Sequence, residues 1–220
     1  MSNSKKVLFF DIDGTLLYAK GSGRKAFQDA FYETYNIPIN VDHINFSGAT
    51  DLDVIHKLLK ENKINDGEKK ISTFFEYLAK YLEINLRNNP PIVFDGVREF
   101  LEEASNNWVF SIVTGNARSC ADLKLKYSKL IDFFPIAGGY GDDSSCRNII
   151  ARIAINRMKD FSEGYLFGDT PKDIEAAKFN GLVSVAVATG KFSYDDLALC
   201  NPDHLIRSFY NAKLVLKDIQ

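Results

Sequence analysis

The stretch VLFFDIDGTLL, residues 7–17, decides the fold of this chain. Its apolar start predicts a buried strand, and Asp11 and Asp13 follow at the end of that strand. Residues i and i+2 share one face of a strand, so two carboxylates placed there would repel each other and resist burial. Gly14 permits a sharp turn directly after them. We therefore expect a site that a positive charge completes.

Composition excludes several classes of protein. The chain has 220 residues, of which 45% are hydrophobic and 25% charged, with a formal net charge of −2. This balance is typical of a globular protein and gives no sign of a nucleic-acid partner or an anionic membrane surface. The apolar runs are too short for a signal peptide or a membrane span. Cys120, Cys146 and Cys200 form no CxxC pair and indicate reduced thiols, which predicts a cytoplasmic location.

A helical block follows the first strand. Phe27 and Phe31 share a face of one expected helix, and Leu78 and Leu82 share a face of another. Thr50 has the spacing of an N-cap for a helix between them. Because no strand pattern interrupts this block, we predict that residues 18–91 form an inserted helical domain.

Strands and helices alternate from residue 92 onward. The segments WVFSIVTGN (108–116), GYLFGD (164–169) and VSVAVATG (183–190) are typical of buried strands, and helical patterns separate them. This alternation predicts an α/β fold with a doubly wound, parallel, Rossmann-like sheet. The predicted sheet domain comprises residues 1–17 and 92–220.

Polar residues stand where the expected strands end, and such sheets bind ligands at that edge. They are Asp11, Asp13, Thr114, Asn116 and Asp169. A set of oxygen ligands without His or Cys favours Mg²⁺. One carboxylate could then attack phosphorus and another could serve as general acid and base.

Three motifs carry a family resemblance. DIDGTLL, VTGN and GDTPKDIEAA, in this order and each closing an apolar strand, resemble the haloacid dehalogenase-like hydrolase superfamily. The helical block resembles the cap of its phosphoglycolate phosphatase and beta-phosphoglucomutase-like members. The resemblance implies a Rossmann-like catalytic core, an α-helical cap, bound Mg²⁺, and phosphoryl transfer through an aspartyl phosphate.

The resemblance also implies residue roles. Asp11 resembles the nucleophile and a magnesium ligand, and Asp13 the general acid/base, whose backbone carbonyl also binds the metal. Asp169 resembles the acidic metal ligand. Asp173 resembles a second acidic residue that holds the metal directly or through water, and its alternative role is to close a capping box with Thr170.

The phosphate site departs from the family pattern at one position. Thr114 resembles the phosphate-binding hydroxyl, with Gly115 and Asn116 beside it. The superfamily usually supplies a lysine before the fourth strand, and no such lysine stands here. Arg147, at the start of an expected helix, is the predicted replacement because arginine stays charged and can bind phosphate through two nitrogens. The alternatives for this role are Lys124 and Lys172.

The cap stretch FSGATD, residues 46–51, resembles a substrate-specificity loop. It makes Gly48, Thr50 and Asp51 candidate specificity residues, together with Arg24 on the first expected helix. The alternatives are that Thr50 only caps a helix and that Arg24 is a solvated charge. The sequence does not identify the substrate or the oligomeric state.

The residue at position 13 selects the chemistry. Superfamily dehalogenases carry tyrosine there, whereas Asp13 can protonate an alkoxide leaving group. We expect a Mg²⁺-dependent phosphatase acting on a small phosphorylated metabolite. One alternative is a sugar phosphomutase, whose cap loop resembles KGxSR, but this chain has Ser47 and Asp51 in place of the two basic residues. A non-catalytic binding protein is the other alternative, and it would be expected to lack Asp11 or Asp13.

Overall fold

A five-stranded parallel sheet forms the centre of the protein. The computed structural model describes residues 5–65, 67–158, 161–212 and 215. The strand order is β4-β1-β5-β6-β7, and the strands are β1 (Lys5–Phe10), β4 (Val109–Ile112), β5 (Phe161–Gly168), β6 (Val183–Val187) and β7 (His204–Ile206). The predicted α/β class with a parallel, Rossmann-like sheet is confirmed.

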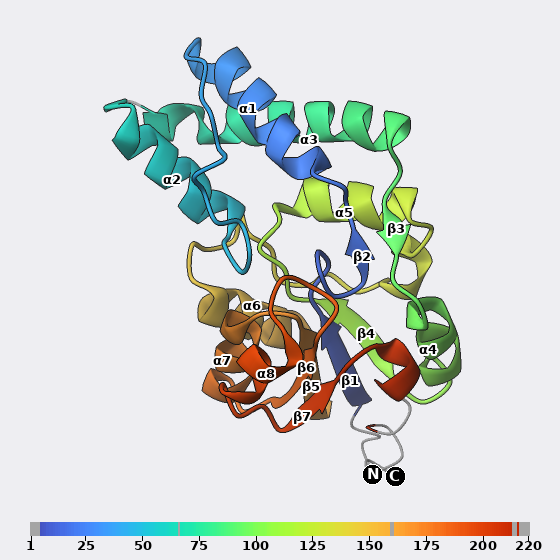
Figure 1. The fold of residues 1–220 in the computed structure, drawn as a ribbon. Coiled ribbons are helices and arrows are strands. Elements are labelled where there is room, and N and C mark those ends of the chain that lie inside the picture. The colour runs from blue at the N-terminus through green and yellow to red at the C-terminus, as the bar shows by residue number, and fades with distance from the viewer. Residues whose placement is uncertain (1–4, 66, 159–160, 213–214, 216–220) are drawn as a thin grey trace.

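Helices cover both faces of the sheet (Figure 1). Leu8 and Phe10 of β1 pack with residues of α4 (Val97–Ala104) and α5 (Arg118–Tyr127), whereas Val7 and Phe9 pack with α6 (Arg147–Met158) and α7 (Pro171–Phe179). Successive side chains of a strand point to opposite faces. A strand covered on both sides therefore needs an uninterrupted apolar run, as VLFF provides. The part of the chain that contains the sheet also forms α8 (Tyr194–Ala198) and the 3₁₀ helices η2 (Ile131–Phe133) and η3 (Phe209–Asn211).

Phe10 lies at the centre of an aromatic cluster directly below the strand end. Its ring centroid is 5.0 Å from that of Phe167 on β5 and 5.7 Å from that of Phe110 on β4. Three further rings surround it, from Phe100, Phe134 and Phe209. This packing fixes the last residue of β1, and with it the position from which Asp11 begins.

The helical block lies beyond the carboxyl-terminal edge of the sheet (Figure 1). It contains α1 (Ser22–Tyr35), α2 (Asp51–Glu61), the 3₁₀ helix η1 (Gly67–Lys70) and α3 (Ile71–Asn88). The chain leaves the sheet through β2 (Leu17–Tyr18) and returns through β3 (Ile92–Val93), and these two strands pair with each other. The sequence pattern did not show this short ladder. The division into a core (1–17 and 92–220) and a cap (18–91) agrees with the arrangement and stays a prediction.

The helical block contacts the core through one loop and one helix. The backbone N–H of Asp51 donates to the carbonyl of Gly115 at 2.7 Å, and that of Leu52 donates to Gly141 at 3.1 Å. Ala117 and Cys120, at the start of α5, pack into the apolar core of the helical block. The cap loop, residues 46–51, is therefore held against the strand ends.

The aromatic cluster predicts a large effect of truncating Phe10. Phe10→Ala should lower the free energy of unfolding by about 3–5 kcal/mol, because the lost ring leaves a cavity among five others. Tyr32→Ala is the control, since Tyr32 is 51% exposed on α1, and it should change the value by about 0.5 kcal/mol at most. Urea unfolding measures both variants. Similar losses in the two would contradict this account of the core.

Candidate active site

Three buried carboxylates meet at the edge of the sheet. Oxygen atoms of Asp11, Asp169 and Asp173 all lie within 4.8 Å of one another. Asp11 follows β1 and Asp169 follows β5, and these strands are neighbours in the sheet. The side chains are almost inaccessible, with exposures of 6%, 3% and 1% for the three residues. The fold thus brings together the side chains of three of the four aspartates predicted from the sequence as metal ligands, and Asp13 is not among them.

Two glycines make room for Asp169. Gly14 has φ +84°, and a Cβ atom added to it would overlap the Asp169 carboxylate. A Cβ added to Gly190, just after β6, would also overlap Asp169. Thr15 donates from Oγ1 to Oδ1 of Asp169 at 3.2 Å. Thr15 and Gly190 were not predicted from the sequence as site residues, although the glycine that closes the strand VSVAVATG was a usable signal.

The electrostatics of this cluster favour a bound cation. Burial, followed by the charges of Asp11 and Asp173, raises the pKa of Asp169 to about 8. Burial raises the pKa of Asp11 to about 6, although the charge of Arg147 opposes this effect. Both shifts show that burial and mutual repulsion of the carboxylates outweigh the positive charge of Arg147. A hard divalent ion with oxygen ligands fits this donor set.

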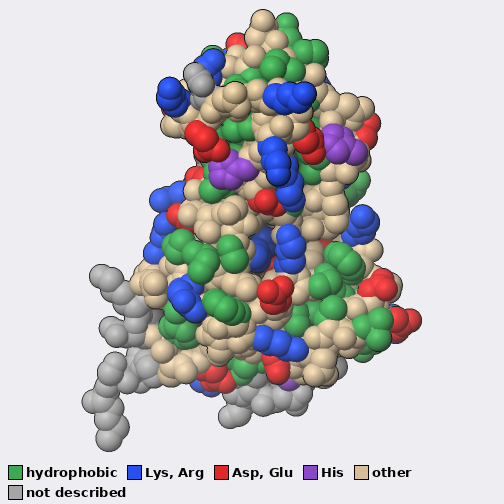
Figure 2. Space-filling view, turned by 90° about the vertical axis from the view of Figure 1, so that its left-hand side faces the viewer, with side chains coloured by type: hydrophobic (Ala, Val, Ile, Leu, Met, Phe, Trp, Pro, Cys, Tyr) green, Lys and Arg blue, Asp and Glu red, His purple; other side chains and the backbone are tan. Residues whose placement is uncertain are grey.

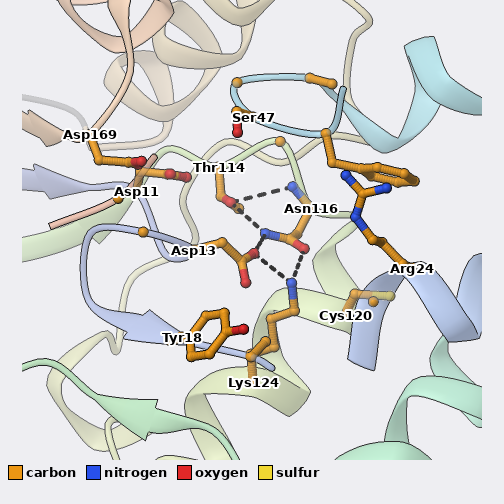
Figure 3. A pocket seen from close by; sticks show the side chains of 18 of the residues that line it. Asp11, Asp13, Tyr18, Arg24, Ser47, Thr114, Asn116, Cys120, Lys124 and Asp169 are labelled. Atoms are coloured by element: carbon orange, nitrogen blue, oxygen red, sulfur yellow. Dashed lines mark hydrogen bonds and ion pairs between the residues drawn. The ribbon is translucent and has the colours of Figure 1, made fainter. Parts of the chain in front are cut away.

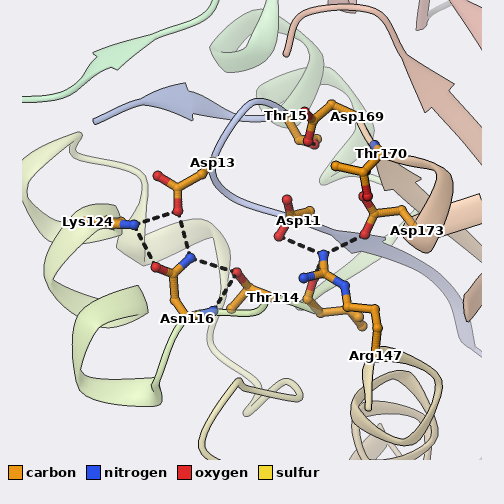
Figure 4. Close-up of polar contacts among 11 residues, drawn as sticks. Asp11, Asp13, Thr15, Thr114, Asn116, Lys124, Arg147, Asp169, Thr170 and Asp173 are labelled. Carbon is orange, nitrogen blue, oxygen red and sulfur yellow. Dashed lines mark hydrogen bonds and ion pairs between the residues drawn. The ribbon is translucent and has the colours of Figure 1, made fainter. Parts of the chain in front are cut away.

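Arg147, the first residue of α6, supplies one positive charge to the cluster (Figure 4). Its Nη2 lies 2.8 Å from Oδ1 of Asp11 and 2.5 Å from Oδ1 of Asp173. Burial alone would lower the pKa of Arg147, but the two carboxylates outweigh it and the net shift is upward. Nη2 also donates to the carbonyl of Val113 at 3.1 Å.

The other terminal nitrogen of Arg147 is directed at the loop after β4. A Cβ added to Gly115 would lie 3.2 Å from Nη1. None of the hydrogen bonds among the described residues uses this nitrogen. The guanidinium thus lies between Asp11 and the Thr114–Gly115 backbone. The alternative cation Lys172 lies elsewhere, with its aliphatic chain beside Gly48 of the cap loop.

Asp173 adopts the capping role that the sequence left open. Its Oδ2 accepts hydrogen bonds from the backbone N–H of Thr170 at 3.1 Å and from the Thr170 hydroxyl at 2.7 Å. The capping box of α7 is complete. Because Oδ1 contacts Arg147, both carboxylate oxygens of Asp173 already have partners in the protein. A metal contact of Asp173 stays a prediction.

A second network surrounds Asp13 (Figures 3 and 4). Nδ2 of Asn116 donates to Oδ2 of Asp13 at 2.7 Å and to Oγ1 of Thr114 at 2.9 Å. Nζ of Lys124 lies 2.5 Å from the same Asp13 oxygen and 2.6 Å from Oδ1 of Asn116. From the sequence, Lys124 was predicted only as an alternative to Arg147. The structure places it beside Asp13 instead.

A cavity of about 520 Å³ opens over both networks. Its cap side includes Phe27, Phe46, Leu78 and Leu82. Figure 2 shows one face of the molecule narrowing between the helical block and the core, with Lys and Arg side chains gathered there.

Arg24 lines this cavity but its guanidinium is already engaged (Figure 3). It donates to the carbonyls of Val41 and Ile44, both at 3.1 Å, and lies 4.6 Å from the ring centroid of Phe46. Arg24 is therefore a bound, half-buried charge and not the solvated one offered as an alternative. Its place in substrate recognition stays a prediction.

The cap loop is held by a helix N-cap within it and by hydrogen bonds to the core. Thr50 accepts from the backbone N–H of Asp53 at 3.1 Å, as a helix N-cap does. Asp51 accepts from the N–H of Ala117 at 2.7 Å. Gly48 has φ +66°, and an added Cβ would lie 3.0 Å from the Thr170 hydroxyl. The loop thus closes one side of the cavity.

Comparison with known proteins identifies the family. The family model described as haloacid dehalogenase-like hydrolase matches residues 8–187. The chain belongs to the haloacid dehalogenase-like hydrolase family. It is 25% identical over 220 residues to a protein from Oceanobacillus iheyensis named pyrophosphatase PpaX, and the match covers 98% of each chain. A Listeria monocytogenes protein of the same name is 24% identical, with 99% of each chain covered.

Solved structures agree in fold. A hydrolase from Pseudomonas syringae has a TM-score of 0.72 at 21% identity, with 99% of each chain covered. A predicted phosphatase from Clostridium acetobutylicum has a TM-score of 0.70 at 19% identity, covering 98% of this chain and all of that one. The predictions of a haloacid dehalogenase-like enzyme and of phosphatase activity are confirmed at this general level. None of the helices in the described ranges is long and apolar enough to span a membrane.

Asp51 predicts a pH dependence of stability. Burial raises the pKa of its carboxyl to about 7, although the Ala117 N–H and Lys124 oppose the shift. The folded protein therefore keeps this proton to higher pH than the unfolded chain, and the free energy of unfolding should fall as pH rises from about 4 to about 7. Asp51→Asn removes the titration while retaining an acceptor for Ala117.

The two proteins are compared by urea unfolding at pH 5 and pH 8 with a metal chelator present. The stability of wild type minus that of Asp51→Asn should fall by about 1 kcal/mol or more between these pH values, since one pKa unit corresponds to about 1.4 kcal/mol. A difference that is constant, or that grows with pH, would show that Asp51 is not held as the structure indicates.

Proposed function

We propose that this protein is a Mg²⁺-dependent phosphatase that hydrolyses a small phosphorylated metabolite through an aspartyl phosphate on Asp11. The observation that carries the proposal is the position of Asp11. It belongs to the buried acidic cluster and contacts Arg147, whereas Asp13 stands in a separate network that contacts Thr114 through Asn116. The two aspartates are thereby given different surroundings for different roles.

The metal would be held by Asp11, Asp169 and the backbone carbonyl of Asp13, with Asp173 as a direct or water-mediated neighbour. When bound, Mg²⁺ offsets the negative charge of the carboxylates and of the phosphoryl oxygens. The raised pKa values of Asp11 and Asp169 support this assignment, because a cation would favour their charged forms.

The reaction has two steps. A carboxylate oxygen of Asp11 bonds to phosphorus while the ester P–O bond breaks, and Asp13 gives its proton to the leaving oxygen. Water then gives a proton to the Asp13 carboxylate and bonds to phosphorus, and the P–O bond to Asp11 breaks to release phosphate. The hydroxyl of Thr114, the N–H of Gly115 and Nη1 of Arg147 would bind the phosphoryl oxygens.

The cap side of the cavity supports an organic phosphate as substrate. Phe27, Phe46, Leu78 and Leu82 line it, and the guanidinium of Arg24 is already engaged with backbone carbonyls. The relatives named pyrophosphatase make inorganic pyrophosphate an essential member of any substrate panel. A phosphomutase is less well supported because Asp51, in a cap-loop position where mutases carry a base, faces the core backbone.

Asp11→Asn and Asp13→Asn test the division of labour. Asp11→Asn should reduce turnover of every phosphate compound to background. Asp13→Asn should still form the phosphorylated protein from 4-nitrophenyl phosphate, whose leaving group needs no proton, and the adduct should persist. Mass spectrometry of acid-quenched protein locates it. Turnover by Asp11→Asn within about tenfold of wild type, equal to about 1.4 kcal/mol of barrier, would exclude Asp11 as nucleophile.

Arg147 should stabilise the transferring phosphoryl group. Arg147→Ala should lower kcat/KM about 10²–10³-fold, comparable to losing one strong transition-state donor. Arg147→Lys should restore part of the activity because the charge returns without the planar fork. Lys172→Ala is the matched control and should retain nearly full activity. If Lys172→Ala loses activity and Arg147→Ala keeps it, the phosphate cation is misassigned.

A further inference from the structure

Lys124 is a buried charge that the proposed reaction has not used. It lies in the last turn of α5 and its side chain is 5% exposed. Burying an ammonium is costly unless anionic or polar partners compensate. Here the partners are Oδ2 of Asp13 and Oδ1 of Asn116, at 2.5 and 2.6 Å. Both belong to residues at the strand ends, so α5 directs this charge specifically at the site.

The contacts form a closed triangle (Figure 4). Lys124 bonds Asp13 and Asn116, and Nδ2 of Asn116 bonds the same oxygen of Asp13. Asn116 also donates to the Thr114 hydroxyl at 2.9 Å. Since Asp13 lies beyond the end of β1, just before a turn, and its side chain is 40% exposed, packing alone does not fix its rotamer. The triangle does so.

The triangle uses only one of the two carboxylate oxygens. Both donors bind Oδ2 of Asp13, and none of the hydrogen bonds among the described residues uses Oδ1. Fixing Oδ2 therefore leaves Oδ1 as the oxygen that can exchange a proton with a leaving group or with water. Effective proton transfer requires such a fixed distance and direction.

We propose that Lys124 is a positioning residue that, together with Asn116, holds Asp13 so that its free oxygen faces the scissile bond. This inference rests on the proposed phosphatase mechanism. Lys124 acts through Asp13 and not by binding the phosphoryl group, which is the role assigned to Arg147. Its loss should affect the step that depends most on Asp13 as a base, hydrolysis of the aspartyl phosphate, and should leave attack by Asp11 nearly unchanged for an activated ester.

The probe is 4-nitrophenyl phosphate with Lys124→Met, which keeps the length of the side chain and removes its charge. Rapid mixing measures the burst of nitrophenolate, which reports phosphorylation of Asp11, and the steady state, which reports hydrolysis of the adduct. We expect the burst rate to stay within about threefold, the steady-state rate to fall about 10–100-fold, and the phosphorylated protein to accumulate. Lys126→Met, an exposed position on the same helix, is the control and should match wild type in both phases.

A double variant separates positioning from a general structural role. In the Asp13→Asn background, Lys124→Met should change the burst and the steady state by less than about twofold, because the residue through which it acts is already lost. Lys124→Arg should restore part of the steady-state rate. A Lys124→Met protein that slows both phases equally, raises KM alone, or multiplies the Asp13→Asn defect would overturn the proposal, as would one that matches the control.

These outcomes differ from failure of the phosphatase mechanism itself. If wild type does not release nitrophenolate and Asp13→Asn does not form an adduct on Asp11, the proposed function is wrong. If the adduct forms and Lys124→Met behaves like Lys126→Met, only the role of Lys124 is wrong. Thermal unfolding of all variants shows whether Lys124→Met is folded, and Lys124→Gln provides a polar substitute if it is not.

Discussion

The structure depends on one constraint, the confinement of like charges at a buried sheet edge. Asp11, Asp169 and Asp173 are each at most 6% exposed and have oxygens within 4.8 Å of one another. Uncompensated carboxylates at this spacing would neutralise by binding protons, as the raised pKa of Asp169 indicates. Arg147 offsets one charge, and a divalent cation and the phosphoryl group complete the balance in the proposed mechanism. The charge of the buried carboxylates is thus balanced only when the cation and the phosphoryl group are bound.

Asp11 and Asp13 of the first motif have different surroundings because β1 ends before either of them. The sequence pattern suggested that Asp11 and Asp13 share a face, as residues i and i+2 of a strand do. β1 ends at Phe10, so that periodicity no longer applies and the two side chains diverge. Asp11 contacts Arg147, whereas Asp13 contacts Asn116 and Lys124. Two residues of one short segment after β1 are therefore chemically distinct carboxylates.

Local patterns predicted much of the fold, because the signals were local. The apolar run of β1 reflects burial on both faces, and Thr170, Pro171 and Gly181 mark the ends of α7 by their individual backbone preferences. Asp11 and Asp169 could be expected at one edge because parallel strands align their carboxyl ends. The short β2–β3 ladder was not predictable in this way, since two-residue strands carry almost no periodicity.

Long-range contacts explain what the sequence left open. Lys124 lies one turn from the end of a helix whose own pattern gives no reason to bury a charge. The packing of α5 between the sheet and the helical block brings its Nζ to Asp13. The same holds for Gly190, which lacks a side chain and so leaves space for Asp169 from the neighbouring strand. Asp173 shows the opposite case, since its spacing to Thr170 predicted the capping box but could not reveal that its second oxygen meets Arg147.

The cap loop and the phosphate loop are joined through their backbones, which links substrate selection to catalysis. Asp51 donates its N–H to Gly115 and accepts from Ala117, so it contacts both sides of Asn116 along the chain. Asn116 in turn bonds Thr114 and Asp13. A displacement of the cap loop would therefore act on the segment that holds both the phosphate hydroxyl and the acid–base residue. In the proposed mechanism, this makes a closed cap a condition for an aligned Asp13, and a substrate that keeps the cap in place also keeps the proton donor in place.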